Sequence, residues 1–193
     1  MNLPNKLTVL RCIMTPVMLA ALLIEFPFHY GVALLLFIAA SLTDMLDGKI
    51  ARKHNLITNL GKFLDPLADK MLTTAAFLGV MCRIGNGNMD ILCWALMLIL
   101  TREFMVTSVR LLAAKDGVVV AASFAGKLKT VMQMVAIIYT LAAFQLMDFG
   151  FTSCGLNFAL VLIAHVIIWV SVIATVVSGI QYVWALRHYF KEN

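Results

Sequence analysis

The chain has 193 residues, of which 62% are hydrophobic and only 13% are charged, whereas charged residues make up about a quarter of an ordinary soluble domain. This composition and a mean hydropathy of +0.95 exclude a typical soluble protein and predict a single membrane domain over residues 1–193. The net charge of +5 is accounted for by cytoplasmic anchoring residues and by anionic lipid or phosphate partners, so we expect no nucleic-acid partner.

Six hydrophobic stretches are each long enough to cross a bilayer core, which requires about 20 mostly apolar residues. In chain order they cover residues 7–28, 31–52, 63–82, 91–113, 130–147 and 156–186. We therefore predict an all-α, polytopic membrane protein: a bundle of six transmembrane helices with a polar cavity that faces the cytoplasm. Residues 181–190 exceed what the last span requires, and we expect them to run along the membrane interface.

The distribution of basic residues predicts the orientation of these spans. Of the 15 Lys and Arg residues, only Arg83 falls in a connection on the far side, and positive residues remain on the cytoplasmic side. Both termini are then cytoplasmic. An even number of spans, such as six, places the two termini on the same side of the membrane. Residues 1–6 lack a small-residue cleavage site, so we expect the first apolar stretch to be a retained span. The four cysteines have no metal-like or disulfide-like spacing and are expected to be free.

Two pairs of aspartates at the edges of the second and third stretches indicate a metal-binding site. Asp44 and Asp47 are three residues apart, Asp65 and Asp69 are four apart, and residues at these spacings share one face of a helix. One Asp at the centre of a span costs roughly 2.5–3.5 kcal/mol, so four of them require a wet, charge-compensated cavity. Ligand sets made only of oxygen select Mg²⁺ or Mn²⁺, and four carboxylates suit a site with two ions.

The residues between the acids fit a phosphate ligand. Gly48 and Ala51 leave a helix face bare for a bulky ligand, and the planar guanidinium of Arg52 suits bidentate contact with an anion. Since Pro is tolerated in the first turn, Pro66 suggests that the third helix begins near Asp65, with its positive end beside the acids. Taken singly, an Asp at the end of a span is more often a solvated cap, and a Gly in a membrane helix is more often a packing contact. Only the joint pattern of these residues favours a metal and phosphate site.

The string Asp44-x-x-Asp47-Gly48-x-x-Ala51-Arg52, followed after eight residues by Gly61-x-x-x-Asp65-x-x-x-Asp69, resembles the signature of the CDP-alcohol phosphatidyltransferases. Three outer motifs resemble the bacterial phosphatidylglycerophosphate synthase branch of that family: Pro4-Asn5-x-x-Thr8-x-x-Arg11, Arg102-Glu103-Phe104 with Arg110, and Gly126-Lys127-x-Lys129-Thr130-x-x-Gln133. The resemblance covers nearly the full chain.

This resemblance implies a six-helix fold in the bacterial cell membrane, usually a homodimer surrounded by membrane lipids. In its cytoplasmic cavity an alcohol attacks the β-phosphate of CDP-diacylglycerol, and CMP leaves. The four aspartates would hold two Mg²⁺ or Mn²⁺ ions, with Asp69 as the base that deprotonates the alcohol. The nucleotide diphosphate would be held by a second group: Thr43, Gly48, Ala51 and Arg52.

The acceptor implied for this branch is sn-glycerol 3-phosphate, whose phosphate needs cationic partners that a neutral alcohol does not need. Arg110, Lys127 and Lys129 are the candidates. Arg102 ranks second, because the neighbouring Glu103 is an available ion-pair partner.

Three alternatives remain open from the sequence. A cardiolipin synthase-like relative, which uses phosphatidylglycerol as acceptor, would share much of the same outer pattern. A membrane prenyltransferase also pairs acidic motifs, but these lie far apart in sequence, whereas here they fall within residues 44–69. A cation transporter is expected to have corresponding broken helices in two halves, whereas the aspartates of this chain cluster in its first half.

Overall fold

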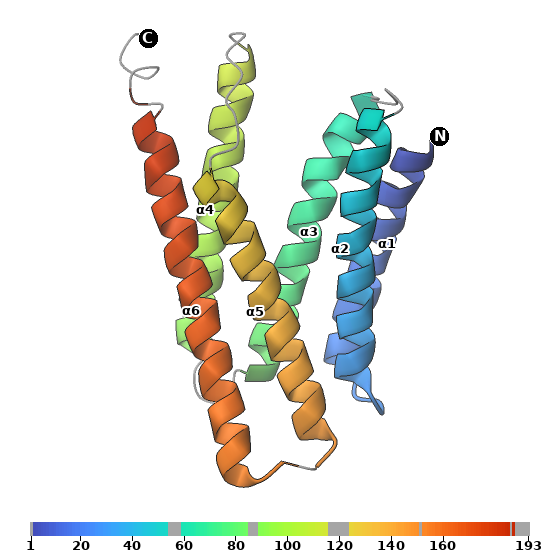
Figure 1. The fold of residues 1–193 in the computed structure, drawn as a ribbon, viewed down its shortest axis with the longest axis vertical. Helices are drawn as coiled ribbons and strands as arrows, with labels where there is room; N and C mark the ends of the chain where they lie inside the picture. Colours follow the sequence, from blue (N-terminus) through green and yellow to red (C-terminus); the bar gives the residue numbers. More distant parts are fainter. Residues whose placement is uncertain are drawn as a thin grey trace.

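The computed structural model describes residues 2–53, 59–84, 89–115, 124–150, 152–185 and 187, apart from the side chains at 3, 4, 46–53, 59, 60, 62, 63, 84, 89–91, 111–115 and 185. These residues form six α-helices that alternate in direction (Figure 1). The helices are α1 Leu3–Leu23, α2 His29–Lys53, α3 Asn59–Ile84, α4 Met89–Lys115, α5 Phe124–Asp148 and α6 Cys154–Ala185. The described ranges contain no β-strand, and the predicted all-α, six-helix architecture is confirmed.

Two helix ends differ from the predicted ones. The first helix ends at Leu23 rather than at residue 28, and Ile24 is already extended (φ −92°, ψ 131°). Pro27 has no N–H to donate to the Leu23 carbonyl, which a continued helix would require. The third helix begins at Asn59, so its predicted start near Asp65 is wrong. Pro66 lies inside α3, where it has no N–H to donate to the carbonyl one turn earlier.

The sixth helix ends at Ala185, within one residue of the predicted end of the last span. Of residues 181–190, predicted to run along the membrane interface, the first five belong to α6, and Tyr182 is only 5% exposed. Burial of the Tyr182 ring against Val106 and Val109 of α4 keeps this part of the chain in the bundle. Residues 188–190 lie outside the described residues.

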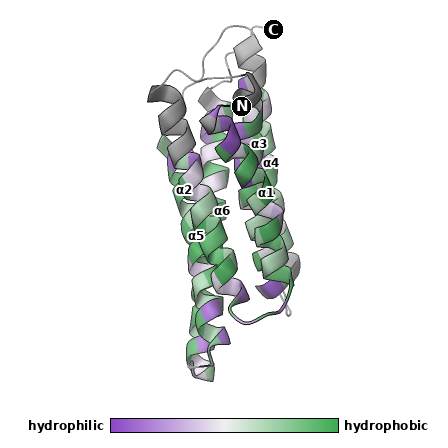
Figure 2. Ribbon diagram, turned by 90° about the vertical axis from the view of Figure 1, so that its right-hand side faces the viewer, coloured by the Kyte–Doolittle hydropathy of each residue, from purple (hydrophilic) through white to green (hydrophobic). Residues whose placement is uncertain are grey.

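The chain is a membrane protein. Among the residues that the structure describes, four segments are long and apolar enough to cross a bilayer: Asn5–Leu23, Leu92–Arg110, Phe124–Asp148 and Cys154–Trp184. In α2 the described apolar segment is His29–Met45, and it includes Asp44, the first residue of the acidic motif. Figure 2 shows that hydrophobic residues cover the middle of the bundle and that hydrophilic ones gather towards its ends.

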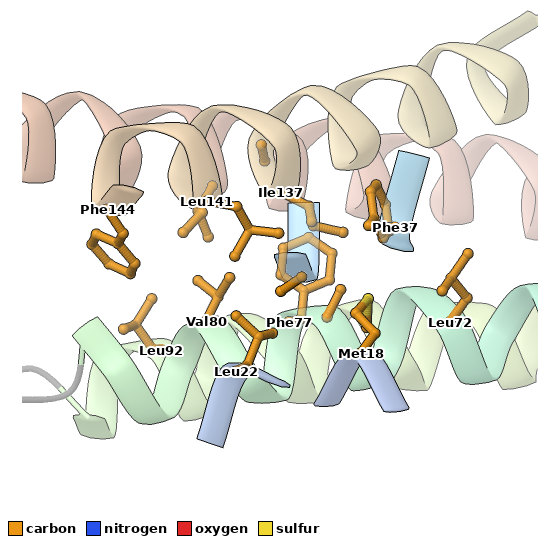
Figure 3. Packing of buried hydrophobic residues seen from close by; sticks show 14 of the residues in the cluster. Met18, Leu22, Phe37, Leu72, Phe77, Val80, Leu92, Ile137, Leu141 and Phe144 are labelled. Atoms are coloured by element: carbon orange, nitrogen blue, oxygen red, sulfur yellow. The ribbon is translucent and has the colours of Figure 1, made fainter. Parts of the chain in front are cut away.

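A hydrophobic core fixes the helices that carry the acids. Met18 and Leu22 of α1 and Phe37 of α2 are fully buried, and they pack in one cluster with Phe77 of α3 and Ile137 of α5 (Figure 3). Helix α1 packs against both α2 and α3, while α6 packs against α4 and α5. This packing holds the carboxyl end of α2 and the amino ends of α3 and α5 at one end of the bundle (Figure 1), where the predicted site residues lie.

Candidate active site

A polar cavity of about 480 Å³ lies between α3, α4 and α5. Asp69, the predicted base, lines it together with all four predicted acceptor-binding residues: Arg102, Arg110, Lys127 and Lys129. These residues come from three helices, so the cavity exists only in the folded bundle. Among the described residues that line it, five are basic and two are acidic. The excess of positive charge favours an anionic occupant.

Glu103 pairs with two of the cations that line the cavity, Lys129 and Arg102. Its carboxylate accepts a hydrogen bond from Lys129 Nζ and forms an ion pair with it, while Arg102 Nη1 lies 3.4 Å from the same oxygen. Arg102 Nη2 also donates to Ser178 Oγ of α6 at 2.7 Å. The predicted pairing of Arg102 with Glu103 is therefore present, but Glu103 pairs with Lys129 as well. Both cations are held in fixed positions, because both are less than 9% exposed.

Lys70 is a further cation in this cavity that sequence reasoning did not select. Its Nζ donates to the Glu103 carbonyl at 3.2 Å and to the Thr107 hydroxyl, and it lies 5.5 Å from the centre of the Phe104 ring. These contacts join α3 to α4 directly beside Asp69. The sequence signal that could have identified Lys70 as a site residue is its position directly after Asp69, the predicted base.

Arg110 and Lys127 lie where a soluble ligand can reach them. The Arg110 Nε donates to the Tyr182 hydroxyl at 3.1 Å, and its guanidinium stacks 5.3 Å from the ring centre. Arg110 is still exposed, as is Lys127 in the first turn of α5. The N–H groups at a helix amino end attract anions, so this end of α5 adds to the positive potential of the cavity.

Two of the acidic-motif carboxylates are held by side chains of α1. Arg11 Nη1 donates to Asp44 Oδ1 and forms an ion pair with it, and Thr8 Oγ1 donates to Asp65 Oδ1 at 2.8 Å. Asp69 is half-buried, and the charges of Asp44 and Lys129 act on its carboxylate. Asp44 and Asp69 therefore lie within electrostatic range of each other although they belong to different helices.

The donors in this region fit a hard divalent cation in their chemistry, since Asp44, Asp65 and Asp69 offer only oxygen atoms. The mutual repulsion of Asp44 and Asp69 is the kind that a bound cation relieves. Within the described part of the chain, no group of three or more Asp, Glu, His or Cys side chains is arranged to hold one ion. The Asp47 side chain, one of the four predicted ligands, lies outside the described residues.

The predicted nucleotide-binding residues are described only in part. Thr43 is half-buried, and its hydroxyl donates to the Ala40 carbonyl of its own helix at 2.7 Å. The backbone of α2 continues through Gly48, Ala51 and Arg52 to Lys53, but their side-chain surroundings lie outside the described residues. The four cysteines are free, as expected.

Comparison with known proteins identifies the family of the chain. The family model for CDP-alcohol phosphatidyltransferase matches residues 1–177. The chain is 39% identical to a CDP-diacylglycerol–glycerol-3-phosphate 3-phosphatidyltransferase of Bacillus subtilis, over 94% of this chain and 93% of that protein. It is 36% identical to the protein of the same name in Rickettsia felis, over 98% and 97% of the two chains. It is also 38% identical to a probable phosphatidylglycerophosphate synthase of Mycobacterium tuberculosis, over 94% and 80%.

The family match spans the acidic motif and all the residues of the charged cavity, and the relatives align over nearly the whole chain. Members of this family are phosphatidyltransferases that generally use divalent metal ions. The chain belongs to the CDP-alcohol phosphatidyltransferase family.

Proposed function

We propose that this protein transfers the phosphatidyl group of CDP-diacylglycerol to sn-glycerol 3-phosphate, giving phosphatidylglycerophosphate and CMP in phospholipid biosynthesis. The observation that carries the proposal is the cavity in which Asp69 shares one space with Arg102, Arg110, Lys127 and Lys129. The names of the relatives from Bacillus subtilis and Rickettsia felis support the same reaction. Family membership favours it over a prenyltransferase or a cation transporter.

The acceptor is the part of the proposal that the cations support. The phosphate of glycerol 3-phosphate brings negative charge into a cavity whose basic residues outnumber its acidic ones by three. Lys127 and Arg110 are exposed enough to meet it first, while Lys129 and Arg102 form the deeper wall. Inositol or serine would leave this excess of positive charge uncompensated, because neither carries a phosphate.

The donor lies on the other side of Asp69 in this proposal. Thr43, Gly48, Ala51 and Arg52 hold the cytidine diphosphate portion, and the acidic residues face its diphosphate. Two Mg²⁺ or Mn²⁺ ions, held by Asp44, Asp47, Asp65 and Asp69, would neutralise the diphosphate charge when bound. The acyl chains remain in the surrounding membrane lipid.

Asp69 acts as the general base in this reaction. It takes the proton of the acceptor hydroxyl, whose oxygen forms a bond to the β-phosphorus of the donor. The bond between that phosphorus and the oxygen of CMP breaks, and CMP leaves with the electron pair. The cations of the cavity keep the acceptor in line for this displacement, so no covalent enzyme intermediate is required.

We further propose that the protein lies in the cell membrane with both termini and the active site in the cytoplasm, and that it forms a homodimer. The soluble acceptor then enters from the compartment that supplies it, and CMP returns there. The clustering of cations at one end of the bundle supports this orientation.

The experiment is a product analysis with purified protein, CDP-diacylglycerol, Mg²⁺ or Mn²⁺ and a panel of acceptors. We expect phosphatidylglycerophosphate and CMP with glycerol 3-phosphate, and no lipid product with inositol, serine or phosphatidylglycerol. Asp69→Asn is the matched control: it keeps the side-chain shape and should lower turnover by about 10²- to 10⁴-fold, the usual contribution of a general base. Cardiolipin formed from phosphatidylglycerol would instead identify a cardiolipin synthase.

A further inference from the structure

The first helix presents a buried polar face to the acidic motif. Asn5, Thr8, Arg11 and Thr15 recur every three or four residues along α1, and each is 5% exposed or less. Polar and charged groups are costly inside a membrane-spanning helix and persist where they have partners and a function. The core packing does not require such a face, since Met18 and Leu22 continue the same helix with apolar side chains.

Two residues on this face reach the two halves of the acidic motif. The Thr8 hydroxyl donates to Asp65 on α3 at 2.8 Å, and the Arg11 guanidinium donates to Asp44 on α2. Thr8 and Arg11 are three residues apart, so their side chains lie on the same face of α1. One rigid helix thus fixes one carboxylate from each of two other helices. The next residue on the face, Thr15, instead donates to the Arg11 carbonyl within α1 at 2.9 Å.

We propose that Thr8 and Arg11 are positioning residues for the cation site: Thr8 orients the Asp65 carboxylate, and Arg11 is the cationic partner of Asp44 until a divalent ion binds. This inference rests on the cation site of the proposed function. A carboxylate accepts hydrogen bonds in about four directions, so the contact with Thr8 fixes Asp65 and leaves other directions for a ligand. Outer partners of this kind commonly contribute 10- to 100-fold to metal affinity.

The two residues act in different ways because only one of them is charged. Thr8 is neutral and does not compete with a cation, so removal of its hydroxyl loosens Asp65. Arg11 is fully buried and forms an ion pair with Asp44, whose side chain is 41% exposed. When no metal is bound, Arg11 offsets the charge of a carboxylate that also acts on Asp69. Its removal therefore harms the metal-free protein more than the metal-bound protein.

The test for Thr8 measures Mn²⁺ binding to purified, metal-stripped full-length protein by electron paramagnetic resonance. We expect Thr8→Val, which keeps the shape but removes the hydroxyl, to weaken Mn²⁺ affinity by about 10- to 100-fold. Thr8→Ser, which keeps the hydroxyl, should bind Mn²⁺ like the wild type. Thr15→Val is the matched control on the same buried face and should also bind normally. Raising the Mn²⁺ concentration should restore the turnover of Thr8→Val.

The test for Arg11 compares thermal unfolding with EDTA and with saturating Mn²⁺. Arg11→Met should lower the melting temperature in EDTA, and Mn²⁺ should raise it by more than it does in the wild type.

Equal Mn²⁺ affinity in Thr8→Val and wild type, or equal weakening by Thr15→Val, would overturn the role of Thr8. An equal Mn²⁺ shift in both proteins would overturn that of Arg11, and if Arg11→Met does not fold, the Thr8 series decides. Wild-type protein that binds no Mn²⁺ would instead reject the cation site itself.

Discussion

Lys127 and Lys129 are two positions apart on α5, yet their surroundings differ. Lys127 is exposed at the cavity, whereas Lys129 is 6% exposed and forms an ion pair with Glu103. A cation that meets only solvent and ligand affects binding. A cation that also neutralises a buried carboxylate affects folding as well. The proposed acceptor site therefore contains residues whose substitutions should be distinguishable by stability.

Lys127→Ala should raise the KM for glycerol 3-phosphate by roughly 10- to 100-fold, because a hydrogen bond to a charged group contributes about 1.5–3 kcal/mol. Its kcat and melting temperature should stay close to the wild-type values. Lys129→Ala should raise the KM as well and should also destabilise the fold. Steady-state kinetics in both substrates, with thermal unfolding of each variant, would check this prediction.

The stability loss in Lys129→Ala should be somewhat smaller than the roughly 3–5 kcal/mol typical of a broken buried pair, since Arg102 remains beside Glu103. A higher KM for CDP-diacylglycerol with an unchanged KM for glycerol 3-phosphate would move these lysines to the donor site. Equal stability of the two variants would contradict the role of Glu103 as a buried partner.

The sequence could predict which residue types the site needs, but not how they are paired. The spacing of the acids and the outer motifs selected Asp69, Arg110, Lys127 and Lys129, which do line one cavity. The spacing did not indicate that Lys70 bonds to α4, or that Thr8 bonds to Asp65. These contacts join residues that are far apart in the chain, so they depend on helix packing rather than on local periodicity.

At the scale of the helices, one glycine sets how closely α1 approaches α3. A Cβ atom on Gly79 would lie 2.5 Å from Leu22 Cδ1 and 3.2 Å from Leu22 Cβ. Leu22 is fully buried in the core and has little room to move. The same contact region holds α1 against the helix that carries Asp65 and Asp69, so the spacing of these helices also affects the site.

Gly79→Ala should destabilise the protein by about 1–3 kcal/mol, the usual cost of overpacking a core, despite the better helix propensity of Ala. Gly155→Ala is the matched control: it is also a helical Gly, but its added Cβ has nothing within 4 Å among the described atoms. Ala is favoured over Gly in a helix by about 0.5–1 kcal/mol, so Gly155→Ala should leave stability equal or slightly higher. Thermal unfolding in detergent measures both, and a stable Gly79→Ala would contradict the close approach.

The existence of the six helices followed from the length of the apolar stretches, but their ends did not. Helices α3 and α5 begin at Asn59 and Phe124, several residues before the predicted spans, because hydrophobicity marks only the part that lies in lipid. Helical hydrogen bonds continue through the polar residues beyond it. The helix start predicted from Pro66 is also wrong: a proline is most favourable in a first turn, but Pro66 lies inside a longer helix, which packs against α1.

At the scale of the whole molecule, charge is distributed unevenly between the two ends of the bundle. Lys6, Arg110 and Lys127 lie towards one end, at the start of α1, the last two turns of α4 and the start of α5. In the described ranges, Arg83 is the basic residue at the other end, and Glu25 pairs with it at 2.9 Å. Positive residues remain on the cytoplasmic side of a membrane, so this asymmetry predicts one orientation for the entire bundle.

Native cysteines allow this orientation to be tested with little change to the protein. Cys154 is exposed at the start of α6, at the end opposite to the charged cavity (Figure 1). In a variant that keeps Cys154 as its single cysteine, a membrane-impermeant maleimide should label intact spheroplasts of a bacterial host. A matched variant with Asn2→Cys, exposed at the other end of the bundle, should be labelled only after the membrane is permeabilised. The reverse pattern would place the cavity outside the cell, where neither a cytoplasmic acceptor nor a CDP-lipid made in the cytoplasm could reach Asp69.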